Sequence, residues 1–139
     1  MKQSNIIHIA AAIITNYSNE MLLVRKQNSP YFMQAGGKIE PTESPIHALV
    51  RELHEELQLV IPPQQLHYVG KFSESAANEA NHRINAHLFS MKLAKISIKA
   101  HAELAEVGWY SMEQAQHLCL APLTEKVILP IVQKNKPAH

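Results

Sequence analysis

The segment from Pro45 to Gln58 has the periodicity of an amphipathic helix with two unlike faces. One face would pack on a core, and its aliphatic residues are Ile46, Leu49, Val50, Leu53 and Leu57. The neighbouring face carries Glu52, Glu55 and Glu56, at the i, i+3 and i+4 positions that lie side by side on a helix. Like charges at this spacing repel by roughly a few tenths of a kcal/mol, and packing does not require them. A hydrated glutamate face is one interpretation; a site for a hard divalent cation, which binds carboxylate oxygens, is the other.

The residues before this helix favour the second interpretation. Gly36 and Gly37 have no Cβ, so that backbone there can approach an ion or a phosphate closely. Ser44 and Pro45 have the order of an N-cap followed by proline at the first helical position. Arg51 follows Glu43 by about two helical turns and could bridge it, bracing the loop against the helix.

This segment resembles the signature box of the Nudix hydrolases, G-x5-E-x7-R-E-U-x-E-E-x-G-U with U aliphatic. The matching residues are Gly37, Glu43, Arg51, Glu52, Leu53, Glu55, Glu56 and Leu59. Gln58 stands where the box has its second glycine. Because glutamine tolerates the left-handed conformation poorly, the helix is expected to end by another geometry before Pro62.

The resemblance implies hydrolysis of a pyrophosphate bond in a nucleoside diphosphate linked to another group, with Mg²⁺ or Mn²⁺. The implied metal ligands are Glu52, Glu55 and Glu56, assisted by the Gly37 carbonyl. Glu52 is also the residue implied to position or deprotonate the attacking water, and Glu55 is counted with it as catalytic. Glu43 and Arg51 are implied to be a structural pair, although Glu43 could instead act only on the helix dipole.

Outside the box, the resemblance points to residues that would complete the site. Glu103 stands six residues before Trp109, where MutT-like members place a ligand glutamate, and it is our candidate for a further catalytic group. Glu106 or Glu79 could serve instead, and each could equally be a surface carboxylate. The candidate substrate-binding residues are Arg25, Lys26, Glu79 and Thr124. Arg25 and Lys26 would contact phosphates, and Thr124 takes the place of an asparagine that MutT itself presents to the base.

The 139 residues predict a single domain, residues 1–139, of the α/β class. The resemblance specifies the Nudix fold, an α/β/α sandwich with a central mixed sheet. Apolar runs predict strands at Ile6–Thr15, Met21–Val24, Tyr31–Gln34, Leu66–Phe72, Arg83–Met91 and Val107–Tyr110. A polar loop is predicted from Ser73 to Asn81, and a C-terminal helix from Pro122 to Gln133, interrupted near Pro130. Trp109 and Phe89 are predicted to belong to the core.

Composition excludes several classes of function. The formal net charge of +1 gives no electrostatic case for a stable nucleic acid partner. No apolar run approaches the length of a membrane span. Cys119 is the one cysteine, which fits a reducing compartment, so we expect a cytoplasmic protein with Cys119 buried and inert. The nine histidines have no zinc-site spacing, and none is assigned to a metal.

The substrate expectation is a small nucleotide, first a (deoxy)nucleoside triphosphate. ADP-ribose or a nucleotide sugar is the alternative, and a homodimer is possible by analogy with relatives. A non-catalytic nucleotide-sensing module is the alternative of another class. Such a module would typically have lost box carboxylates, and this chain keeps all of them.

Overall fold

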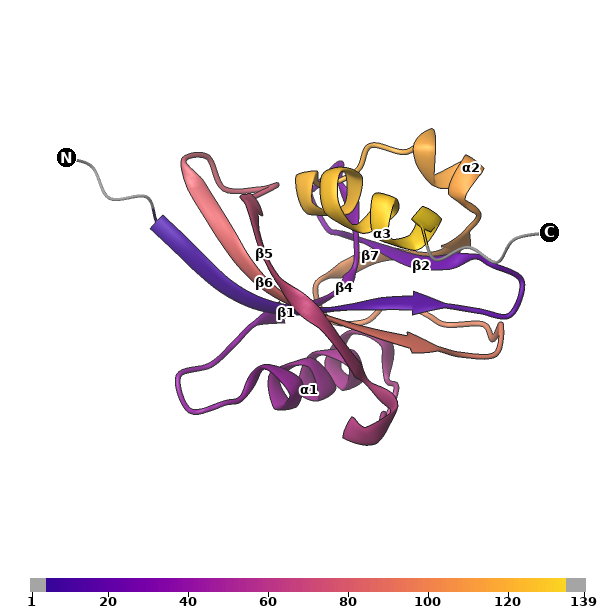
Figure 1. Cartoon of the computed structure of the whole chain (residues 1–139), viewed down its shortest axis with the longest axis horizontal. Helices are drawn as coiled ribbons and strands as arrows, with labels where there is room; N and C mark the ends of the chain where they lie inside the picture. Colours follow the sequence, from indigo (N-terminus) through magenta and orange to yellow (C-terminus); the bar gives the residue numbers. More distant parts are fainter. Residues whose placement is uncertain (1–4, 135–139) are drawn as a thin grey trace.

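The computed structural model describes residues 5–134, in which a mixed seven-stranded sheet is flanked by helices on both faces (Figure 1). The strands are β1 (Asn5–Thr15), β2 (Met21–Lys26), β3 (Phe32–Met33), β4 (Ala35–Lys38), β5 (His67–Ser75), β6 (His82–Lys92) and β7 (Leu104–Tyr110). The helices are α1 (Pro45–Leu57), the 3₁₀ turn η1 (Pro63–Gln65), α2 (Met112–Gln116), the π-helical turn η2 (Thr124–Ile128) and α3 (Leu129–Lys134). The predicted α/β/α arrangement is confirmed.

The sheet runs in the order β3-β2-β1-β6-β5, with β4 also paired to β1 and β7 also paired to β2. β1 and β6 are parallel, and the other pairs are antiparallel. β1 is therefore central, and β4, which pairs with β1, continues into the loop before α1. This connection places the glycine pair of β4 against the carboxylate face of α1.

Two cores form because alternate residues of a strand point to opposite faces. Ala10, Ala12 and Ile14 of β1 pack under α1, together with Leu49 and Leu53 of that helix. The residues between them face the layer formed by α2, η2 and α3, where the buried side chains include Ala11, Ile13, Leu123, Ile128 and Leu129. Phe89 is buried as predicted, and Trp109 packs against the first core while its indole N–H donates to the Ile96 carbonyl at 2.9 Å.

Helix α1 begins as its sequence predicts and ends differently. The Ser44 side chain accepts a hydrogen bond from the His47 backbone N–H, and Pro45 is the first helical residue. At the other end Gln58 adopts φ 55° and ψ 32°, so the prediction of another geometry is wrong. In this conformation the Gln58 N–H donates to the His54 carbonyl at 2.9 Å and the Leu59 N–H donates to the Leu53 carbonyl at 3.3 Å. These bonds, with Leu59 packed on the core, compensate the strain of the glutamine.

Gln58→Gly is expected to raise the free energy of unfolding by about 1 kcal/mol, because glycine occupies the left-handed region without the penalty of a Cβ. Denaturant unfolding of the purified protein measures this change. Gln58→Ala is the control, since alanine keeps the Cβ and should give no gain. Equal stabilities of the glycine and alanine variants would contradict the explanation.

Several strands and helices begin or end at residues other than those predicted. β5 continues to Ser75 because Ser73–Ser75 pair with Arg83–Asn85 of β6, which shortens the predicted loop. β7 begins at Leu104 and so includes Glu106, and the stretch 93–100 has no regular structure. The C-terminal helix is interrupted as predicted, but by a π turn that ends just before Pro130.

Cys119 is exposed, so the prediction that it is buried is wrong. It lies beside β3, where its backbone carbonyl accepts a hydrogen bond from the Phe32 N–H. No helix within residues 5–134 is long and apolar enough to cross a membrane.

Candidate active site

Arg51 holds the carboxylate face of α1 together. Its guanidinium binds both oxygens of Glu43, at 2.7 and 2.9 Å, so the expected ion pair is present. The Nη1 atom also donates to Glu52 at 2.9 Å and to Glu55 at 3.2 Å, and Nη2 donates to the Lys38 carbonyl at 3.2 Å. The Arg51 hydrogen bonds and the Glu40 backbone N–H lower the pKa of Glu43 to about 2. The loop before the helix is thus fastened to it by a doubly bonded pair, which is among the stronger ion-pair geometries.

Glu56 lies at the buried edge of this face, only 4% exposed. Its carboxylate accepts a hydrogen bond from the Gly36 N–H at 3.1 Å. Burial is the main cause that raises the pKa of Glu56, to about 8 in all: the Gly36 hydrogen bond and Lys26 lower the pKa, whereas the charges of Glu52 and Glu103 raise it. A buried acid in this state has a strong affinity for positive charge, either a proton or a metal cation.

Gly37 allows the Glu52 carboxyl group to touch the backbone of β4. A Cβ on Gly37 would lie 2.5 to 2.8 Å from the three atoms of that carboxyl group, closer than van der Waals contact permits. Burial raises the pKa of Glu52, although Arg51 opposes the shift. Glycine is therefore needed at position 37 for steric reasons, because any side chain there would push the Glu52 carboxyl group away from the β4 backbone.

The donors implied for the metal lie around one end of α1. Within residues 5–134, no three acidic, histidine or cysteine side chains converge on a common point, because Arg51 holds Glu52 and Glu55 while Glu56 turns towards Gly36. Their chemistry nevertheless fits a hard cation, which takes carboxylate and carbonyl oxygens. The space that a Cβ would fill at Gly37 and the raised pKa of Glu56 agree with this fit.

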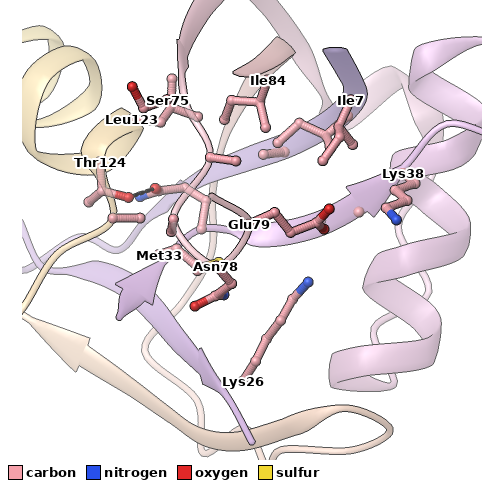
Figure 2. A pocket seen from close by; sticks show the side chains of 18 residues that line it. Ile7, Lys26, Met33, Lys38, Ser75, Asn78, Glu79, Ile84, Leu123 and Thr124 are labelled. Carbon is pink, nitrogen blue, oxygen red and sulfur yellow. Dashed lines mark hydrogen bonds between the residues drawn. The ribbon is translucent and has the colours of Figure 1, made fainter. Parts of the chain in front are cut away.

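A pocket opens beside this face, between β1, β4, the loop after β5 and the start of η2 (Figure 2). Lys26, Lys38 and Glu79 lie at the end nearest α1, and Thr124 lies at the opposite end. Between them the wall is apolar and is formed mainly by Ile7, Ile9, Ala11, Met33, Ile84 and Leu123. The pocket is therefore cationic towards the carboxylates and neutral at its far end.

The structure separates Arg25 from Lys26. Lys26 lines the pocket, with its Nζ atom 4.0 Å from the Glu103 carboxylate. Arg25 instead forms an ion pair with Glu106 at 2.8 Å and donates to the Ser29 carbonyl. Glu106 is thereby occupied, whereas Glu103 is 78% exposed and close enough to Glu56 to affect its pKa.

A sequence comparison decides the family, because residues 7–130 match the protein-family model described as the NUDIX domain. The chain belongs to the Nudix family. Its sequence is 36% identical over 120 residues to the "CTP pyrophosphohydrolase" of Escherichia coli (strain K12), covering 84% of each chain. As a MutT-like Nudix protein with this relative, the chain is a pyrophosphohydrolase.

Solved structures agree with this assignment. The solution structure of the E. coli ORF135 protein superposes with a TM-score of 0.66 at 29% identity, covering 93% of this chain and 87% of the other. The crystal structure of the MutT protein from Methanosarcina mazei Go1 superposes with a TM-score of 0.78 at 23% identity, covering 99% and 100%. The second likeness shows the shared Nudix fold.

Sequence reasoning missed four polar residues that line this Nudix pocket, namely Gln34, Lys38, Ser75 and Asn78. Gln34 is 6% exposed, and its Oε1 atom accepts a hydrogen bond of 2.7 Å from the Thr124 hydroxyl. Its Nε2 atom donates to the Met21 sulfur at 3.4 Å. The sequence signal that could have indicated Gln34 is its amide at the end of the predicted strand Tyr31–Gln34, two residues before the glycine pair.

Proposed function

We propose that the chain hydrolyses a nucleoside triphosphate at a pyrophosphate bond, with CTP as the first substrate to test. The observation that carries this proposal is one continuous pocket with a cationic end beside the box carboxylates and a neutral end at Gln34 and Thr124. A triphosphate with a neutral base has the complementary arrangement, with negative charge at one end and an uncharged base at the other. The E. coli relative named a CTP pyrophosphohydrolase supports the choice of CTP.

The dimensions of β4 agree with this orientation. Gln34 and Gly37 are three residues apart, which corresponds to about 10 Å along an extended chain. Gly37 contacts Glu52 at the carboxylate end, while Gln34 contacts Thr124 at the neutral end. The phosphates would therefore lie near Lys26 and Lys38, and the base would lie against the apolar wall.

Glu52, Glu55, Glu56 and the Gly37 carbonyl would hold Mg²⁺ or Mn²⁺, which supplies charge neutralisation of the phosphates and a more acidic bound water. Lys26 and Lys38 would attract the triphosphate and fix its orientation. Glu52 would accept the proton of the attacking water, a role that its raised pKa favours.

Other charged residues would support this arrangement. Arg51 would hold Glu52 and Glu55 in place, and Glu103, beside Lys26, would adjust the charge near Glu56. Glu79 would face the substrate from the loop above, while Arg25 would only brace the strand end.

A substrate panel tests the proposal. The purified chain is assayed by chromatography and phosphorus NMR with ribo- and deoxynucleoside triphosphates, ADP-ribose, nucleotide sugars and dinucleoside polyphosphates, with Mg²⁺, with Mn²⁺ or with excess chelator. The expected result is conversion of a triphosphate to a monophosphate and pyrophosphate, lost in chelator. A higher kcat/KM for ADP-ribose or a nucleotide sugar, full activity in chelator, or no turnover of any compound would overturn it.

Homodimer formation and a cytoplasmic location stay predictions from the sequence.

A further inference from the structure

At the neutral end of the pocket, the side chains of Gln34 and Thr124 are hydrogen-bonded to each other, and Gln34 is also bonded to Met21, which does not line the pocket. Thr124 and Gln34 come from opposite sides of the pocket, from η2 and from the residue between β3 and β4. Thr124 is 1% exposed and Met21 is fully buried, so neither group has bulk water as an alternative partner. The order of the bonds is Thr124 hydroxyl to Gln34 oxygen, then Gln34 nitrogen to Met21 sulfur.

Met21 determines the direction of this chain of bonds. A thioether sulfur is a weak acceptor and never a donor, so it can face the Gln34 NH₂ group but gives nothing to its oxygen. The Gln34 oxygen is therefore directed at Thr124, and the Thr124 hydroxyl donates its one hydrogen to that oxygen. What remains for a ligand is acceptor capacity on the Thr124 oxygen and the second hydrogen of the Gln34 nitrogen.

We propose that the Gln34–Thr124 pair selects nucleotides whose base carries an amino group beside a ring-nitrogen acceptor. This inference rests on the proposed function and assigns the chemistry of the base that the pocket accepts. Cytosine, with N4 and N3, and adenine, with N6 and N1, present such an edge. Uracil and hypoxanthine present the reverse, a carbonyl beside a ring N–H, which would place acceptor against acceptor and donor against donor.

The surroundings of the pair support a neutral recognition site. Among the described residues that line the pocket, Glu79 is the one carboxylate, and it lies at the end with Lys26 and Lys38 (Figure 2). Thr124 has apolar neighbours such as Leu123 and Ala121. In such surroundings a mismatched polar edge would leave buried groups without partners, which costs more than a hydrogen bond gains.

The experiment compares matched base pairs under identical conditions: kcat/KM for CTP against UTP, and for ATP against ITP. In the unmodified chain the amino-bearing nucleotide is expected to be favoured about tenfold or more in the pair that turns over faster. Thr124→Val should lower kcat/KM for that nucleotide about tenfold and bring the ratio close to one. Thr42→Val makes the same chemical change at an exposed position of the turn before α1, outside the pocket, and should leave the ratio unchanged.

Met21→Leu gives a second, independent test, since leucine conserves volume but removes the sulfur acceptor. The amide of Gln34 is then free to reverse, the Thr124 proton is released, and the amino preference should fall. A ratio near one in the unmodified chain, or a preference that survives Thr124→Val, would overturn the inference. Absence of triphosphate hydrolysis would instead contradict the proposed function, so the two failures are distinguishable.

Discussion

Glu56→Gln is expected to lower kcat/KM at least about 100-fold while leaving the protein folded and no less stable. The side chain is 4% exposed, and glutamine has the shape of a protonated glutamate. Its amide oxygen can still accept the hydrogen bond from the Gly36 N–H. The negative charge that a cation requires would be lost, so binding and hydrolysis should fail while packing is preserved.

The pH dependence of stability separates this explanation from simple unfolding. The pKa of Glu56 is about 8 in the folded protein, against an ordinary value of 4.5 for a glutamate in the unfolded chain. The folded state therefore holds a proton that the unfolded state releases between these values, and the Glu56 contribution to stability is full below pH 4.5 and declines as pH rises to 8. Glutamine does not titrate, so the variant should gain stability relative to the unmodified chain across this range.

Activity assays and denaturant unfolding at several pH values measure both effects. Glu113→Gln, at an exposed position of α2, is the matched control and should keep both activity and pH dependence. Full activity in Glu56→Gln would contradict the metal role. A stability difference that does not change with pH would contradict the assigned protonation.

Gly36→Ala is expected to destabilise the fold by about 3 kcal/mol or more. Gly36 has φ +149°, where residues with a Cβ are strained. The added Cβ would also lie 2.2 Å from the Ala10 carbonyl oxygen and 2.7 Å from the Ala11 Cα. Both atoms are backbone of β1, which is paired on its other side with β6 and cannot withdraw.

Gly37→Ala is the matched control for this substitution, because its conflict is with a side chain. There the added Cβ meets the Glu52 carboxyl group, which can rotate away. Unfolding experiments should therefore show a much smaller loss of stability for Gly37→Ala, accompanied by lower activity. Similar stabilities of the two variants would contradict the distinction between a backbone and a side-chain conflict.

The elements that the sequence predicted well are those with local signals. Ser44 and Pro45 determine the start of α1 through contacts within one turn, and the apolar run Ile6–Thr15 differs from β1 by one residue. The ending at Gln58 could not be predicted, because tertiary packing of Leu59 and α1 outweighs the local preference of glutamine. The extension of β5 to Ser75 likewise depends on pairing with β6, which no local pattern reveals.

The site shows the same division. The bond between Glu43 and Arg51 follows from spacing along one helix and its preceding loop. Arg25 and Lys26 are adjacent and both basic, yet successive strand residues point to opposite faces. Only the register of β2 against β7 decides which of them faces the pocket. Gln34 could not be assigned a partner, because Thr124 lies 90 residues further along the chain.

Pro130 affects the orientation of Thr124, although Pro130 itself does not line the pocket. A proline has no N–H and crowds the carbonyl four residues earlier, so an ordinary α-helix through this point is unfavourable. The wider π turn, in which the Leu129 N–H reaches the Thr124 carbonyl, relieves this crowding. The rotation of Thr124 about the helix axis is therefore set by a proline downstream of the pocket. If Thr124 contacts the base as proposed, a mutation that restores the common helical register is expected to change base selection without altering any residue that lines the pocket.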